Sequence, residues 1–144
     1  MELQDLEIRI SKVRRSVKNI NLGGCGVFAY ELYKILKFEF GIETEIRFTG
    51  FKSGKTIRFD HVLLRLKEGT QEHPDIFIDS NGIFYGHIAT EGNTLDPFEM
   101  EDLLGQKELW NKAFHYYFQD EEFNITSNEN FLKKMMYTYI SNRI

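Results

Sequence analysis

The sequence predicts an α+β domain with helices toward both ends of the chain and a sheet in the middle. Apolar residues recur every three or four positions in residues 2–18, in residues 25–36 and again after residue 96, which is typical of amphipathic helices. Residues 42–85 instead show alternation and short apolar runs between turn signals, which indicates strands. The tight-turn signals between them favour an antiparallel meander.

Two helices are expected in the first forty residues, joined by a turn rich in Asn and Gly at residues 19–24. The second helix begins at Cys25 and ends at Gly41, because glycine readily adopts the left-handed conformation that terminates a helix. Its polar side is expected to carry Glu31, Lys34 and Lys37. The apolar stripes of the two helices are Leu3, Leu6, Ile10, Val13 and Val17, followed by Phe28, Ala29, Leu32, Ile35 and Leu36.

About four antiparallel strands are expected in the middle third. The first is half-exposed, with Glu43, Glu45 and Arg47 on its polar face. A loop or wide hairpin turn is expected at residues 50–54, and Ser80-Asn81-Gly82 predicts a tight turn before the last strand. The expected strands are residues 42–48, 56–66, 74–79 and 83–85.

The C-terminal third returns to a helical pattern. Asp96-Pro97 is typical of a helix start, and Ser127 is expected to cap a further helix that runs to Ile140. The chain of 144 residues is predicted to be one domain, with a core in residues 19–90 and a helical part in residues 96–144.

Composition excludes several classes of function. A formal net charge of −4 argues against a protein that binds nucleic acid by neutralising phosphates, and the basic cluster Lys12, Arg14, Arg15 and Lys18 is interpreted as a solvated helix face. No apolar run approaches a membrane span, and the acidic N-terminus has no signal-peptide pattern. A single cysteine excludes an internal disulfide and favours a reducing, cytoplasmic setting.

Cys25 is the centre of the candidate site. It lies in a glycine-rich turn at a helix start, where free backbone N–H groups and the helix dipole stabilise a thiolate. Two later segments offer partners, Asp60-His61 and Ile78-Asp79. One hairpin register between them places Arg65 opposite Asp75, Leu63 opposite Phe77 and His61 opposite Asp79, all on one face of the sheet.

These residues suggest the roles of a catalytic triad. Cys25 would be the nucleophile, His61 its ion-pair partner and general acid, and Asp79 the group that orients the imidazole. The backbone N–H of Cys25 would hold an oxyanion together with Asn19 or Asn21. Substrate would approach the sulfur past three glycines: Gly23, Gly24 and Gly26.

Structural interpretations stand beside these roles. A lone cysteine is usually a packing residue, His61 could be a hydrogen-bonded strand histidine, and Asp79 before Ser-Asn-Gly could serve only as an Asx-turn residue. Asp60 ranks below Asp79 as the orienting group, because alternation sends it to the opposite face. His73, His87 and His115 are expected at the surface or in the core. Without a close-spaced ligand pair, no metal or cofactor is expected.

The motifs Gly-Gly-Cys25-Gly-Val-Phe-Ala, Asp-His61-Val-Leu-Leu and Phe-Ile-Asp79-Ser-Asn-Gly resemble the papain-like cysteine peptidase superfamily. They are most similar to its compact bacterial branches: bacteriocin leader peptidases, cell-wall amidase-like peptidases and transglutaminase-like domains. The resemblance covers about residues 19–85. It implies a papain-like fold in which the Cys-bearing helix packs on an antiparallel sheet that carries the histidine and the aspartate.

The expected function is a cysteine-dependent hydrolase or acyl-transfer enzyme that acts on an amide bond of a peptide or protein through a thioester on Cys25. A peptidase is the default member of this class. The alternative is a non-catalytic interaction module or effector on the same fold, with the aromatic-rich, acidic C-terminal third as its working surface.

Overall fold

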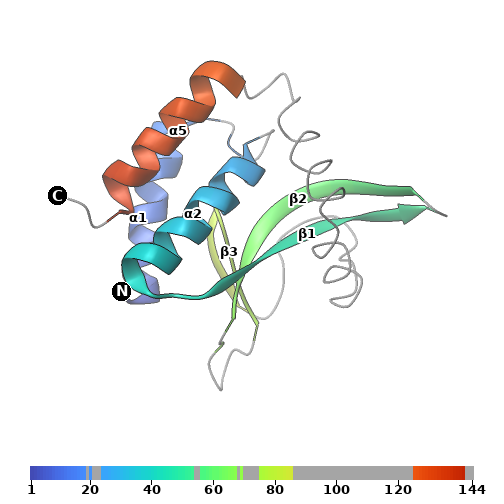
Figure 1. The fold of residues 1–144 in the computed structure, drawn as a ribbon, viewed down its shortest axis with the longest axis horizontal. Coiled ribbons are helices and arrows are strands. Elements are labelled where there is room, and N and C mark those ends of the chain that lie inside the picture. Colours follow the sequence, from blue (N-terminus) through green and yellow to red (C-terminus); the bar gives the residue numbers. More distant parts are fainter. Residues whose placement is uncertain are drawn as a thin grey trace.

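The computed structural model describes residues 1–18, 20, 24–53, 56–67, 69, 75–85 and 125–141, and for residues 48–53, 56–60 and 125–129 only the backbone. These residues form three helices and one four-stranded antiparallel sheet (Figure 1). The α+β class predicted from the sequence is therefore confirmed. The elements are α1 (Leu3–Ser16), α2 (Cys25–Phe40), β1 (Thr44–Ser53), β2 (Thr56–Leu66), β3 (Ile76–Asp79), β4 (Gly82–Tyr85) and α5 (Ile125–Tyr139).

Helix α2 is the centre of the core. It packs against β1, β2 and β3 of the sheet and against α5, while α1 packs against α5 and β4. In Figure 1 the three helices lie together, and the long β1–β2 pair extends away from them. As predicted, α2 ends at Gly41, whose φ of 66° is left-handed, and the Ile42 N–H returns to the Leu36 carbonyl at 2.8 Å.

The core joins the predicted helical stripes to the inner face of the sheet. Its helical members are fully buried because the apolar positions fall on one side of each helix. The core includes Leu6, Ile10 and Val13 of α1, Phe28, Leu32, Ile35 and Leu36 of α2, Val62, Leu64 and Ile78 of the sheet, and Leu132 and Met136 of α5.

The register between β2 and β3 differs from the predicted one by two residues. Leu64 pairs with Ile78, and Arg65 pairs with Phe77, whereas the prediction placed Leu63 opposite Phe77. A shift of two residues keeps every side chain on its predicted face, because side chains alternate with period two. Arg65 still reaches Asp75, as a diagonal neighbour, at 3.0 and 3.1 Å. Long side chains bridge diagonal positions, so favourable pairs did not distinguish the two registers.

Strand β1 is longer than predicted. The segment 50–54 was expected to be a loop or turn, but β1 continues to Ser53 and pairs with the start of β2. Thr49 pairs with His61, but the next residue, Gly50, pairs with Phe59. Asp60 is therefore an extra residue in β2 without a partner position in β1. Gly50 therefore accompanies a β-bulge rather than a turn.

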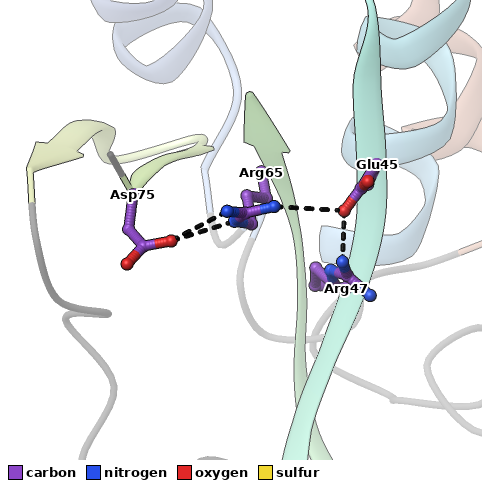
Figure 2. A network of polar contacts seen from close by, with 4 residues as sticks. All are labelled: Glu45, Arg47, Arg65 and Asp75. Atoms are coloured by element: carbon purple, nitrogen blue, oxygen red, sulfur yellow. Dashed lines mark hydrogen bonds and ion pairs between the residues drawn. The ribbon is translucent and has the colours of Figure 1, made fainter. Parts of the chain in front are cut away.

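Two charged residues that were expected at the surface are buried, and both form ion pairs. Arg47 is only 5% exposed and pairs with Glu45, which is 3.5 Å from Arg65, and Arg65 in turn binds Asp75 (Figure 2). Glu31, predicted on the polar side of α2, is 4% exposed at the contact with α5. Each of these buried groups has an ion-pair partner of opposite charge, which compensates it for the loss of water.

Other predictions on the helical third have different outcomes. Helix α5 begins at Ile125, so Ser127 lies inside the helix and is not its cap. The helix expected from Asp96 lies outside the described residues, and so do His73, His87 and His115.

Candidate active site

Cys25 is the first residue of α2, as predicted. The preceding Gly24 donates to the Ile20 carbonyl at 2.6 Å, and the first hydrogen bond within the helix runs from the Phe28 N–H to the Gly24 carbonyl at 3.0 Å. The backbone N–H groups of Cys25, Gly26 and Val27 precede that bond, so they form the N-terminal turn that has no intrahelical acceptor. This turn directs partial positive charge toward the Cys25 region.

His61 and Asp79 are in direct contact. His61 Nε2 lies 2.8 Å from Asp79 Oδ2, and both side chains are buried, with residue exposures of 6% and 5%. The predicted register made them directly opposite partners, but they meet as diagonal neighbours on the same face. The hydrogen bond supports Asp79 rather than Asp60 as the group that orients His61. The reason given from the sequence was regular alternation along the strand, and the β-bulge at Asp60 interrupts that alternation.

The other carboxylate oxygen of Asp79 closes the turn. The Asn81 N–H donates to Asp79 Oδ1 at 2.7 Å, which is the Asx-turn arrangement. The structural and functional interpretations of Asp79 are therefore compatible, since each uses a different oxygen. Because both oxygens are engaged, the carboxylate has a fixed orientation against the imidazole.

The electrostatics of His61 depend on both neighbours. Burial by itself lowers its pKa, but the hydrogen bond to Asp79, the hydrogen bond to the Cys25 side chain and the negative charge of both groups prevail and raise the pKa from 6.5 to about 10. The raised pKa favours the imidazolium form of His61. With Nε2 held by Asp79, Nδ1 is the ring nitrogen left for the sulfur.

Three predicted site residues thus come together from three elements: Cys25 from α2, His61 from β2 and Asp79 from β3. Cys25 is 2% exposed, so all three side chains are buried. Gly24 and Gly26 flank Cys25 and are buried, whereas Asn19, Asn21 and Gly23 lie outside the described residues.

Two side chains of α1 hold the turn that carries Asp79, and the sequence did not point to them. Arg14 Nη1 donates to the Ser80 carbonyl at 2.8 Å, and Glu7 Oε2 accepts from the Ile83 N–H at 2.7 Å. Arg14 is half-buried, so its assignment to a solvated face was wrong. The available signal was their spacing of seven residues, which places both beside the apolar stripe on one side of the helix.

Among the described residues, no group of three or more His, Cys, Asp or Glu side chains is arranged to hold a metal ion. In the same part of the chain, no helix combines the length and apolar character that crossing a membrane requires.

Comparison with known proteins gave no match: no protein-family model, no curated protein and no solved structure resembles this chain significantly.

Proposed function

We propose that this protein is a cysteine-dependent hydrolase or acyl-transfer enzyme of papain-like type, most simply a peptidase, that forms a thioester on Cys25. The observation that carries the proposal is the His61–Asp79 hydrogen bond beside Cys25, whose side chain helps to raise the pKa of His61. A nucleophile, a base and an orienting carboxylate in this order are the set that covalent catalysis at an acyl carbon requires.

The proposal requires the sulfur in its nucleophilic form, which for a cysteine is the thiolate. Cys25 lies at the N-terminal turn of α2 with His61 as a neighbour. Asp79 keeps the imidazole in one orientation and stabilises its positive charge. The thiol must stay reduced, so a cytoplasmic location is part of the proposal.

In the proposed reaction, the Cys25 sulfur attacks the carbonyl carbon of an amide bond and forms a carbon–sulfur bond. His61 gives its Nδ1 proton to the amide nitrogen, the carbon–nitrogen bond breaks, and an amine leaves. Water, or another nucleophile in an acyl transfer, then attacks the thioester carbon and gives a proton to His61. The carbon–sulfur bond breaks, the acid or the transferred acyl product leaves, and the thiolate and the imidazolium are restored. The Cys25 N–H, with Asn19 or Asn21, would bind the oxyanion.

The first test is alkylation of the thiol. Iodoacetamide at pH 6 should label Cys25 at least about tenfold faster than free cysteine, because a thiolate rather than a thiol reacts. His61→Ala should abolish the advantage, and Cys25→Ser should take up no label. Arg15→Gln, which changes an exposed charge on α1, is the matched control and should react like the wild type. Labelling no faster than free cysteine would contradict the proposal.

The second test looks for the intermediate. The chain is mixed with a pool of peptide amides, quenched in acid and weighed by intact-mass spectrometry. An acyl adduct that hydroxylamine removes and that is absent from Cys25→Ser identifies a thioester. Loss of the adduct in Asn19→Ala or Asn21→Ala would show which amide contributes to the oxyanion site.

One observation favours a second function, a non-catalytic protein-interaction module on the same fold. Cys25 is almost fully buried, as is expected of a core residue rather than of the nucleophile of an open active site. In this case the thiol is a core residue, and alkylation of the folded chain is slower than that of free cysteine. The alkylation rate therefore separates the two functions.

A further inference from the structure

Helix α1 holds both sides of the β3–β4 turn. The guanidinium of Arg14 donates to the Ser80 carbonyl at 2.8 Å on one side, and the carboxylate of Glu7 accepts from the Ile83 N–H at 2.7 Å on the other. Each contact joins residues more than sixty positions apart in the chain. Both are side chain to backbone bonds, so they fix the path of the turn itself.

The same short turn carries the Asp79 carboxylate. Asp79 pairs with Gly82 across the hairpin, so Ser80 and Asn81 are the only residues between them. Ser80 follows Asp79 directly, and the Asn81 N–H binds Asp79 Oδ1 at 2.7 Å. Movement of the Ser80 carbonyl would therefore rotate the Ser80–Asn81 peptide, whose N–H binds Asp79 Oδ1, and shift the carboxylate relative to His61.

The fit of α1 on the turn is close. Gly82 has a φ of 123°, and a Cβ atom placed on it would collide with the Glu7 carboxylate. Glu7 and Arg14 lie two helical turns apart on α1, whose buried residues Leu6, Ile10 and Val13 anchor it in the core. A helix fixed in the core thus sets the position of the turn through two polar contacts.

We propose that Glu7 and Arg14 are positioning residues that hold the Asp79 carboxylate against His61 by fixing the β3–β4 turn. This rests on the proposed function only in that the His61–Asp79 pair serves Cys25. Neither side chain is a catalytic residue, since each acts through the backbone of the turn. A purely structural role would lower stability and leave the properties of His61 unchanged.

The test measures the protonation of His61 without any substrate. Ring C–H signals of the histidines are followed by NMR from pH 5 to pH 11, and His61→Gln identifies the His61 signal. The wild-type midpoint is expected at about 10. Arg14→Met and Glu7→Met, which keep the aliphatic stems but remove the polar contact, should each lower the midpoint by about one pH unit.

Matched variants separate positioning from a general effect on the fold. Arg15→Met and Glu2→Met, at exposed positions on and before the same helix, should leave the midpoint unchanged. Arg14→Lys and Glu7→Gln retain a donor and an acceptor, so they should return the midpoint toward the wild-type value. If the methionine variants do not fold, Arg14→Lys and Glu7→Gln are compared with the wild type, and a smaller shift of the same sign is expected.

A His61 midpoint that stays at the wild-type value in Arg14→Met and Glu7→Met overturns the proposal, even if the melting temperatures of these two variants fall. A wild-type midpoint near 6.5 overturns it as well, because the His61–Asp79 pair would then be absent. The proposed function fails separately: if no thioester forms but the midpoint moves with Arg14→Met, the positioning stands and the enzyme assignment does not.

Discussion

Asp79 serves two neighbours with two different oxygens, one toward the His61 imidazole and one toward the Asn81 backbone. Its two roles can therefore be separated by substitution. Asparagine at position 79 keeps an oxygen that can accept from the Asn81 N–H but lacks the negative charge that favours the imidazolium. Alanine at position 79 lacks both the oxygen and the charge.

Asp79→Asn should lower the pKa of His61 from about 10 toward 6.5, because the charged acceptor that favours the imidazolium is gone. The turn should survive, so the cost in stability should be about 1–3 kcal/mol. Asp79→Ala should cost more, since the Asn81 N–H also loses its acceptor. Urea unfolding and a histidine NMR titration measure the two effects. Equal losses of stability would show that the Asx turn contributes nothing.

At the scale of the elements, two glycines with positive φ offer a matched pair. Gly41 has a φ of 66° and open space around it, whereas Gly82 has a φ of 123° and the Glu7 carboxylate beside it. Gly41→Ala should cost about 1 kcal/mol for the left-handed backbone alone. Gly82→Ala should cost about 1–3 kcal/mol for the strained backbone, and more because Glu7 must move. Chemical denaturation compares them, and equal losses would mean that Glu7 yields freely.

Helices α2 and α5 meet around a buried carboxylate. Glu31 Oε1 lies 3.0 Å from Lys34 Nζ. The Tyr137 hydroxyl donates a hydrogen bond to Glu31 Oε2 at 3.3 Å. Burial, the charge of Glu31 and this hydrogen bond raise the pKa of Tyr137, with Lys34 acting in the opposite direction.

Glu31→Gln should destabilise the protein by about 1–3 kcal/mol, because a buried polar group loses charge-assisted partners. Tyr137→Phe removes one hydrogen bond and should cost about 0.5–1.5 kcal/mol. Thermal unfolding of both variants is the measurement. A Glu31→Gln variant as stable as the wild type would show that the charge does not join the helices.

At the scale of the whole molecule, His61 makes stability depend on pH. Its pKa is higher in the folded chain than the 6.5 of an unfolded histidine, so the folded state binds the proton more tightly. The stabilisation is complete below pH 6.5 and is lost as the pH rises to about 10. The free energy of unfolding should therefore fall across this window, and His61→Gln should flatten the decline. An equal free energy of unfolding of the wild type at pH 6.5 and at pH 9.5 would contradict this dependence of stability on His61.

Periodicity in the sequence was enough to predict the helices that the structure describes, the alternating strands and the shared face of His61 and Asp79. It could not predict the β2–β3 register, because period two fixes the face of a side chain but not its direct partner. Gly50 was interpreted as a turn residue because a turn and a bulge both favour glycine.

The sequence also failed to predict which charged residues are buried or partly buried. Arg47, Glu31 and Arg14 were expected in solvent, and each instead contacts a polar partner. For Glu31 and Arg14, the partner comes from an element distant in the sequence.

The contact between Glu7 and the Ile83 N–H also has a consequence for self-association. Strand β4 is the outer strand of the described sheet, and an outer strand exposes backbone donors that can pair with another chain. At Ile83 that donor is already occupied by a carboxylate from α1. A second chain can extend the sheet there only by displacing Glu7. Helix α1 therefore makes aggregation through this edge less favourable.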